Sequence, residues 1–401
     1  MHPTTILGLS AISTLLNAVS AQDLPLDHQP GFEECTVGVA SGRATLDGRP
    51  LLWKNRDASA VNNEVVYFDD GRFAFVGIVN AGQTKSVWGG VNERGFCIMN
   101  SLSTDLPGGA PSGMGNGQLM RLALQTCADV DDFAELLTKT DKGGRRTKAN
   151  FGVIDAKGGA AIFETSHLAH RLYDATNPET APEGYIVRAN FAMTGGGNGG
   201  RQRYERAEVL CRTAVDTERL DYRYLLRNFC RDLDGAEKTG DQLRLQNSIN
   251  RRSTVAAMVF HGVQERENPA LTTFWAILGE PILSVAVPCW VRAKGTAPEL
   301  DGAERSPLCD LAIEIKKQSY VMAESGPLRL ELKGVETTRP VIFTAEDRIF
   351  DHTDKALSDW RRKLPAPRAV QRFHEEMAKA AMAGLRVAQR ALNATRSGTR
   401  R

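Results

Sequence analysis

The sequence has little net charge and no fixed-period repeat. Lys and Arg total 50 against 48 Asp and Glu in 401 residues, which gives a formal net charge of +2. This near balance excludes the polyelectrolyte character expected of a protein that binds nucleic acid or an anionic membrane surface. The hydrophobic fraction of 42% is too high for a disordered chain, and the ordinary Gly and Pro content excludes a collagen-like or low-complexity sequence. The composition therefore predicts a folded protein whose function depends on local sites.

Beyond residue 21 the sequence also lacks an apolar run long enough to cross a bilayer. The N-terminal stretch of residues 6–21 is apolar and rich in small residues, and it ends in Val19-Ser20-Ala21. This pattern is typical of a secretory signal peptide cleaved after Ala21, with a short buried helix or strand as the alternative. We therefore expect residues 1–21 to be a signal peptide and the protein to be secreted or periplasmic.

The cysteine count is odd, since the chain contains seven. In an exported protein at least one thiol would be left over by disulfide pairing, and such a thiol is a candidate reactive group. Two pairings are conceivable, Cys211 with Cys230 and Cys289 with Cys309, but buried free thiols explain most of the seven equally well.

Cys35 stands at the start of a predicted hairpin. Asp47-Gly48 is a strong turn signal, and an antiparallel hairpin centred on it places the residue opposite Cys35 near Ala60. The polar cluster at residues 54–57 is then placed within a few residues of the Cys35 thiol. Its charged groups can therefore tune the reactivity of that thiol. The two runs of strand composition that flank the turn are residues 36–45 and 50–57.

No histidine lies close to Cys35 in the sequence, which leaves two routes to activate its thiol. One is a Cys–His pair with a distant histidine such as His261. The other is cleavage of the chain before Cys35, so that its own α-amine, with a pKa of about 7.7–8.0, becomes the general base. The second route needs a short disposable prosegment, and residues 22–34 are polar, rich in turn-forming residues and of suitable length.

Several further segments follow Cys35 in a fixed order. The set is Glu34-Cys35-Thr36, the Lys54–Asp57 block, residues 90–100 ending in Asn100, the helical pair 118–137, the hairpin 150–164, Arg188-Ala189-Asn190 and residues 202–207 with Arg203. Each motif is weak alone, but the ordered set is specific and spans about residues 34–210. It resembles the choloylglycine hydrolase and isopenicillin-N acyltransferase group, which are N-terminal-nucleophile (Ntn) hydrolases acting on linear amides and include penicillin V acylases and bile-salt hydrolases.

The resemblance implies a role for each matching residue. Cys35 is the nucleophile and, after cleavage of the Glu34–Cys35 bond, supplies the amine base, which Asp57 orients. Asn100 and Asn190 match the residues around the oxyanion hole, and Arg203 matches a late supporting Arg. Lys54 stands where the family usually has Arg, and a Lys cannot form the Arg fork. Arg56 is the candidate to replace it.

Simpler interpretations exist for the same residues taken singly. Asn100 and Asn190 are explained as turn-capping residues, and Asp57 with Arg203 as a surface ion pair. His167 and His170 have a metal-like spacing, but no partner ligands are nearby, so no metal site is expected. The glycine-rich run at residues 194–200 lacks the frame of a phosphate loop, and we expect a mobile loop beside Asn190 that lines the substrate pocket.

The predicted fold class is α+β, as the four-layer αββα sandwich that the family resemblance implies. The predicted domains are the signal peptide 1–21, an autocatalytically removed propeptide 22–34, an Ntn-hydrolase domain 35–330 and a C-terminal extension 331–401. In the second half, helices are predicted at residues 204–216, 220–232 and 366–391, and strands at 254–262, 281–291, 328–333 and 339–344. The C-terminal extension lies outside the resemblance. Three roles remain open for it: it covers the sandwich, it contacts a second copy of the chain, or it forms a separate module.

The predicted activity is cysteine-dependent cleavage of a small-molecule N-acyl amide through a thioester, with no cofactor, no nucleic-acid partner and no membrane span. Hydrolysis is favoured over acyl transfer because an exported enzyme meets water in excess. The alternatives are an acyltransferase of the isopenicillin-N type, a non-catalytic exported binding protein on an Ntn scaffold, and a Cys–His peptidase.

Overall fold

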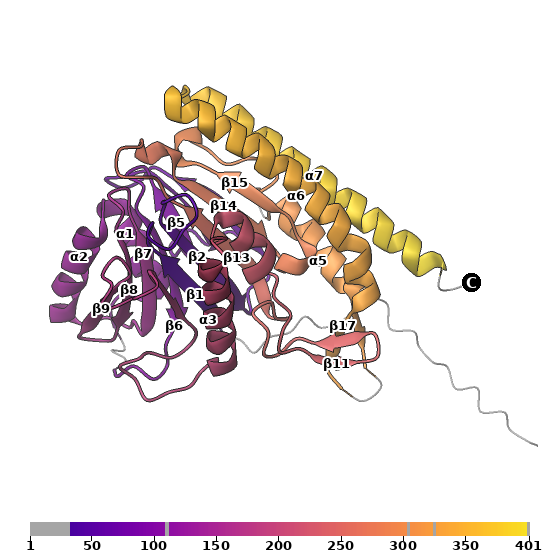
Figure 1. Cartoon of the computed structure of the whole chain (residues 1–401), viewed down its shortest axis with the longest axis horizontal. Coiled ribbons are helices and arrows are strands. Elements are labelled where there is room, and N and C mark those ends of the chain that lie inside the picture. The colour runs from indigo at the N-terminus through magenta and orange to yellow at the C-terminus, as the bar shows by residue number, and fades with distance from the viewer. Residues whose placement is uncertain (1–32, 109–111, 303–304, 324–325, 399–401) are drawn as a thin grey trace, which may run out of the picture.

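The computed structural model describes residues 33–108, 112–302, 305–323 and 326–398. The predicted signal peptide and residues 22–32 of the predicted propeptide lie outside these ranges. Within them, two large antiparallel sheets face each other and helices cover both outer sides (Figure 1). The α+β class and the predicted αββα layering are therefore confirmed.

The six-stranded sheet carries Cys35 and is antiparallel throughout. Its central strands are buried along their whole length, as expected of a sheet covered on both faces. In spatial order its strands are β10 (Tyr185–Arg188), β1 (Glu33–Ala40), β2 (Leu51–Ala58), β13 (Thr254–His261), β14 (Thr273–Leu278) and β15 (Ala286–Cys289).

The seven-stranded sheet is a simple meander in which each strand pairs with the next along the chain. Its inner face packs on the six-stranded sheet. Its outer face is covered by α1 (Asn116–Thr126) and α2 (Val130–Gly143), with an aromatic cluster around Phe133, Phe151 and Phe163 between them. The strands are β3 (Asn63–Phe68), β4 (Phe75–Asn80), β5 (Gly89–Asn92), β6 (Cys97–Leu102), β7 (Ala149–Ile154), β8 (Ala160–Thr165) and β9 (His170–Asp174).

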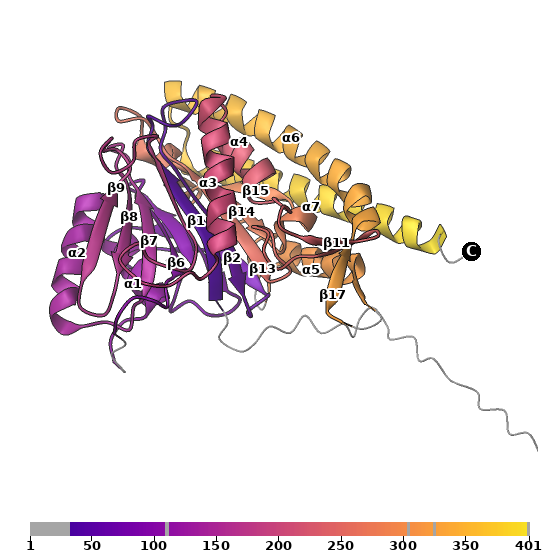
Figure 2. The ribbon, with the colours of Figure 1, turned by 60° about the horizontal axis from the view of Figure 1, so that its bottom comes forward.

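The other face of the six-stranded sheet is covered by helices from the second half of the chain. Helix α3 (Arg201–Asp216) contacts β1 and β10, and Figure 2 shows it next to β1. It is followed by α4 (Tyr222–Tyr224) and a single π-helical turn, η2 (Leu225–Phe229), where Phe229 packs edge-on against Trp53 of β2. The indole ring of Trp53 in turn contacts Gly38, where a Cβ atom would sit 2.1 Å from the ring.

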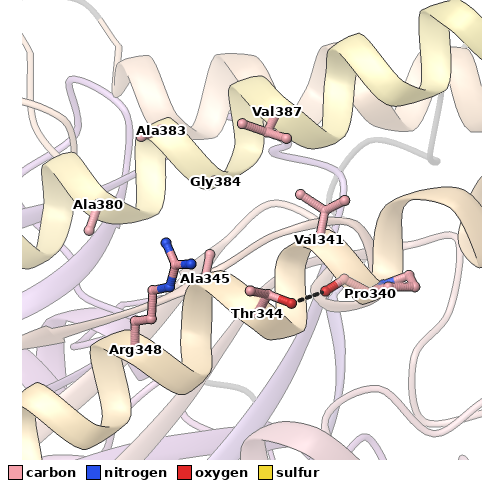
Figure 3. A pocket seen from close by; sticks show the side chains of 9 residues that line it. All are labelled: Pro340, Val341, Thr344, Ala345, Arg348, Ala380, Ala383, Gly384 and Val387. Carbon is pink, nitrogen blue, oxygen red and sulfur yellow. Dashed lines mark hydrogen bonds between the residues drawn. The ribbon is translucent and has the colours of Figure 1, made fainter.

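Two long helices, α6 (Leu332–Arg362) and α7 (Pro367–Gly398), run side by side across β15 (Figure 1). They approach closely where Gly384 faces Ala345, since a Cβ on Gly384 would lie 2.5 Å from that of Ala345. A shallow apolar groove opens between them (Figure 3). A buried carboxylate, Glu346, ties α6 to the sheet by accepting from the backbone N–H of Ala286 at 2.7 Å and pairing with Arg231 at 2.5 Å.

The remaining elements are short. A small antiparallel sheet joins β11 (Glu237–Thr239), β12 (Gln242–Arg244), β17 (Leu328–Glu331) and β16 (Tyr320–Met322), with α5 (Pro307–Ser319) preceding β16. Three single 3₁₀ turns are η3 (Pro269–Leu271), η4 (Pro281–Leu283) and η5 (Val291–Ala293).

Most predicted elements are present, but three predictions were wrong in detail. Residues 339–344, predicted as a strand, form part of helix α6, which contains Pro340 in its interior. Residues 281–291 contain a 3₁₀ turn before β15 rather than one strand. The residue opposite Cys35 is Arg56 and not a residue near Ala60.

The hairpin register differs because β1 ends at Ala40 and β2 begins at Leu51. The ten residues between them form a loop in which Asp47-Gly48 makes only a local turn, with Gly48 at φ +71°. The strands therefore pair about a centre two residues earlier than the turn signal indicated. The polar block nevertheless lies even closer to Cys35 than predicted.

Candidate active site

Cys35 is the third residue of β1, and its side chain is 4% exposed. Directly paired residues of an antiparallel sheet project to the same face. Cys35 pairs with Arg56, and Val37 pairs with Lys54, so these side chains share the face that meets the seven-stranded sheet. Asp57, which pairs with Glu34, belongs to the opposite face. The predicted site residues are thus distributed over both faces of the start of β1.

On the thiol face, Lys54 connects the two sheets. Its Nζ donates to Asn100 Oδ1 at 2.8 Å and to the carbonyl of Trp88 at 3.0 Å. Burial lowers the pKa of the Lys54 ammonium, and the neighbouring Cys35 sulfur acts in the opposite direction. Because the ammonium holds the amide oxygen of Asn100, the NH₂ end of that side chain is left as the donor. This is the orientation that an oxyanion-binding Asn requires.

The surroundings of the Cys35 thiol favour its protonated form. Burial raises the pKa of Cys35, and the carboxylates of Asp57 and Glu33 raise it further. Lys54 and Arg56 act against this by favouring the thiolate. Arg56 does not take over the role of Lys54, because its guanidinium donates to Asn63 and Asn80 and lies over the Trp88 ring.

On the other face, the buried carboxylate of Asp57 has three neighbours. Thr254 Oγ donates to it at 2.6 Å, Arg251 Nη1 lies at 3.3 Å, and Arg203 Nη1 lies at 4.0 Å. Burial raises the pKa of Asp57, while the two arginines and the Thr254 hydrogen bond oppose that rise. Arg251 and Thr254 were missed by sequence reasoning, since an Arg pair before an apolar strand carries no distinguishing signal.

The backbone of Cys35 is fixed by Arg203 and Asn190. Arg203 Nη1 donates to the carbonyl oxygen of Cys35 and to Thr36 Oγ1, both at 2.9 Å, and its Nη2 donates to Asn190 Oδ1 at 2.8 Å. The backbone nitrogen of Cys35 donates to the same Asn190 oxygen at 3.2 Å. The nitrogen of the Asn190 amide donates to the carbonyl of Leu102 at 2.9 Å. In this state Asn190 therefore accepts from the backbone nitrogen of Cys35 and does not present a free oxyanion donor.

The two residues before Cys35 are both acidic and both paired. Glu34 Oε2 lies 2.8 Å from Arg203 Nη2 and also contacts Arg251, while Glu33 lies 3.6 Å from Arg56. The structure thus gathers all seven predicted residues, Cys35, Lys54, Arg56, Asp57, Asn100, Asn190 and Arg203, around the Glu34–Cys35 bond.

The glycine-rich loop beside Asn190 is tied down by two carboxylates. Glu164 accepts from the backbone N–H groups of Met193 and Thr194 at 2.7 and 3.0 Å, and Asp105 accepts from those of Ala192 and Gly197 at 3.1 Å. The expectation that this loop is mobile and lines the substrate pocket remains untested.

The Cys–His alternative finds no support in this geometry. His261 pairs with Leu51, five residues along β2 from the partner of Cys35, a distance of about 16 Å at the usual rise per residue. Its Nε2 lies 2.8 Å from Asp47 at the far end of the hairpin.

The seven cysteines, all within the described ranges, are buried free thiols. Among the described residues, no cluster of three or more His, Cys, Asp or Glu side chains is placed to hold a metal ion. No helix in the described ranges combines the length and hydrophobicity needed to cross a membrane.

Comparison with known proteins agrees with the predicted resemblance. Residues 44–211 match the family model described as acyl-coenzyme A:6-aminopenicillanic acid acyl-transferase. The match covers nearly the whole segment in which the ordered motifs were recognised, and the resemblance is therefore confirmed.

Three solved structures are similar to this chain. A variant of the conjugated bile acid hydrolase from Clostridium perfringens has 11% identity and a TM-score of 0.41, covering 61% of this chain and 89% of that one. Penicillin V acylase from Agrobacterium tumefaciens has 13% identity and a TM-score of 0.40, covering 64% and 85%. The Caenorhabditis elegans ortholog of N-acylethanolamine-hydrolyzing acid amidase has 14% identity and a TM-score of 0.43, covering 57% and 92%. The sequence matches no curated protein.

Proposed function

We propose that this protein is an exported cysteine Ntn hydrolase that removes its own residues up to Glu34 and then cleaves the linear amide bond of a small N-acyl substrate. The observation that carries the proposal is the pair of bonds on the Cys35 backbone. Asn190 Oδ1 accepts from the Cys35 nitrogen, and Arg203 donates to the Cys35 carbonyl. A main-chain nitrogen bound by a side-chain amide oxygen is well placed to be held there as a free amine after cleavage.

Self-cleavage is an N-to-S acyl shift followed by hydrolysis. The Cys35 sulfur attacks the carbonyl carbon of Glu34, the peptide C–N bond breaks, and the nitrogen takes up a proton to become the α-amine. Water then hydrolyses the Glu34 thioester, which releases the prosegment as a carboxylate and frees the thiol. Loss of Glu33 removes a negative charge that raises the pKa of the Cys35 thiol, and its removal therefore favours the thiolate.

Turnover repeats the same chemistry on a substrate. The α-amine takes the thiol proton, the thiolate attacks the amide carbonyl, and the N–H groups of Asn100 stabilise the oxyanion. The amine leaves with the proton from the α-ammonium, and water hydrolyses the thioester. Lys54 supports the thiolate as a point charge, where the resembling family has Arg.

The first test is the intact mass of the purified protein. A chain that begins at Cys35 supports the proposal, and a chain that begins at residue 22 counts against it. Cys35→Ala should retain residues 22–34 and lose amidase activity, whereas Cys97→Ala, which changes another buried thiol, should still cleave itself. Amidase activity retained in Cys35→Ala would refute the proposal. The products formed in the presence of added amines separate hydrolysis from acyl transfer. Hydrolysis releases only the free acid, whereas acyl transfer forms a new amide with the added amine.

Export is part of the proposal and rests on the apolar segment before residue 22. Expression of the full chain with its own N-terminus, followed by fractionation, tests it. Activity confined to the cytosol would exclude it.

A further inference from the structure

Two arginines bind the carboxylate of Glu34, the residue on the acyl side of the bond that Cys35 is proposed to cleave. Arg203 Nη2 lies 2.8 Å from Glu34 Oε2, and Arg251 Nη1 contacts the same oxygen. The side chain of Arg203 is 3% exposed and that of Arg251 is 17% exposed. A carboxylate bound by two largely buried guanidinium groups occupies a built anion site and not a surface ion pair.

Self-cleavage would leave this site short of negative charge. Glu33 and Glu34 depart together, and with Glu34 goes the carboxylate that pairs with both Arg203 and Arg251. Removing a bound carboxylate from two largely buried guanidinium groups is unfavourable unless another anion replaces it. The mature site is therefore matched to an anionic ligand.

The position of that anion follows from the chemistry of the two reactions. In self-cleavage the sulfur attacks the carbonyl carbon of Glu34, and in turnover the carbonyl carbon of the substrate must reach the same sulfur. Three carbon atoms separate the backbone carbonyl of Glu34 from its side-chain carboxylate. An acyl group of the same length places its terminal carboxylate against the same two arginines.

We infer that the preferred substrates carry a five-carbon acyl group ending in a carboxylate, of the glutaryl or γ-glutamyl type, which Arg203 and Arg251 bind in the place of Glu34. This inference rests on the function proposed above. The substrate C–N bond breaks as the C–S bond forms, the amine leaves with the proton of the α-ammonium, and water releases the five-carbon diacid from the thioester.

Matched anilides test the inference on the self-cleaved wild-type protein. Glutaryl anilide should have a kcat/KM about 10- to 100-fold above that of pentanoyl anilide, which has the same length without the charge. Succinyl and adipoyl anilides, one carbon shorter and longer, should fall between them. Equal or better hydrolysis of pentanoyl anilide would overturn the inference while leaving the proposed function intact. A preference for a carboxylate on the anilide ring would also overturn it, because that anion lies on the amine side.

A pair of variants identifies the binding residue. Arg251→Gln should lose most of the preference for glutaryl over pentanoyl anilide through a higher KM, and its neighbour Arg252→Gln should keep it. Rates are expressed per self-cleaved molecule, counted by intact mass. A preference unchanged in Arg251→Gln would overturn the assignment.

Ligand binding gives a readout that does not depend on turnover. Glutarate should raise the melting temperature of the self-cleaved wild-type protein more than pentanoate does, and this difference should shrink in Arg251→Gln. If no anilide is hydrolysed but glutarate still stabilises the cleaved protein selectively, the proposed function fails and the anion site stands. If glutarate and pentanoate have equal effects, the anion site is refuted.

Discussion

The ammonium group of Lys54 lies 2.8 Å from the amide oxygen of Asn100, and this bond joins the two facing sheets beside the Cys35 thiol. It fixes the orientation of Asn100 and places a positive charge next to the sulfur. Both effects depend on a residue at which this chain departs from the family that it resembles.

Replacing Lys54 by Met should lower activity at neutral pH. Lys54 lowers the pKa of Cys35, so its loss should raise that pKa and move the rising limb of the pH–rate profile to higher pH. Activity should recover in part as the pH is raised, because the thiolate forms above the thiol pKa. Lys85→Met, at an exposed lysine, serves as the control. An unshifted profile in Lys54→Met would show that the ammonium does not tune the thiol.

Substitution of Asn100 and of Asn190 by Ala should impair different steps, turnover in the first case and self-cleavage in the second. Asn100→Ala removes the NH₂ group left available by Lys54, so kcat should fall by about 10²–10³-fold, as on loss of an oxyanion donor. Asn190→Ala removes the acceptor of the Cys35 backbone nitrogen, so the uncleaved precursor should accumulate. Mass spectrometry and the rate per cleaved molecule separate the two effects. Equal accumulation of precursor in both variants would contradict this division of roles.

How much of this site can be predicted from the sequence depends on how far each site residue lies from Cys35 along the chain. The placement of Lys54 and Asp57 beside Cys35 follows from one hairpin, and a register error of a few residues did not disturb it. Asn100, Asn190 and Arg203 come from three further segments, and only their order in the family resemblance connected them to Cys35. Arg251 has no such signal, because its role depends on the pairing of β13 with β2 across almost 200 residues.

The fold shows the same limit. Periodicity predicted the long C-terminal helix, because its amphipathic pattern is local. The helical pair and the central hairpin were predicted from the family resemblance. Local sequence pattern failed at residues 339–344, where Pro340 is followed by four residues of high β-propensity, as in a strand. These residues are helical because they continue α6 across the sheet, and tertiary packing overrides local propensity there.

Glu346 should be important for stability although it lies far from the thiol. It is fully buried, pairs with Arg231 at 2.5 Å and Arg227 at 2.9 Å, and accepts from the backbone of Ala286. Glu346→Gln leaves the buried Arg231 without its carboxylate and removes one of the two carboxylates that pair with Arg227, so the free energy of unfolding should fall by about 3–5 kcal/mol. Asp347→Asn, which changes the adjacent and largely exposed carboxylate, should alter it by less than about 1 kcal/mol. Chemical denaturation checks both, and equal effects would contradict the prediction.

His374 should make stability depend on pH. It is buried in α7, accepts from the backbone N–H of Ala297 at 3.0 Å and donates to the carbonyl of Pro288 at 2.8 Å, which is the neutral form of the ring. Burial lowers the pKa of His374. Below its ordinary pKa of about 6.5 the unfolded chain binds a proton that the folded chain does not, so the contribution to stability is present above that pH and declines as pH falls.

Melting temperatures measured at about pH 7.5 and about pH 5 check this prediction. The drop between the two values should be smaller in His374→Gln than in the wild-type protein, because Gln keeps a donor and an acceptor but does not titrate. His352→Gln, at an exposed histidine of α6, should leave the drop unchanged. An identical drop in all three proteins would exclude His374 as a source of the acid sensitivity.

The contact between His374 and Pro288 also affects how the protein behaves at high concentration. Strand β15 is the last strand of its sheet, and a bare outer strand offers N–H and C=O groups to any other extended chain. Here Pro288 has no N–H to offer, and its carbonyl is already taken by the imidazole ring. Helix α7 therefore blocks the addition of a strand from another molecule to the edge strand β15. We expect a chain truncated before Pro367 to aggregate through this exposed strand.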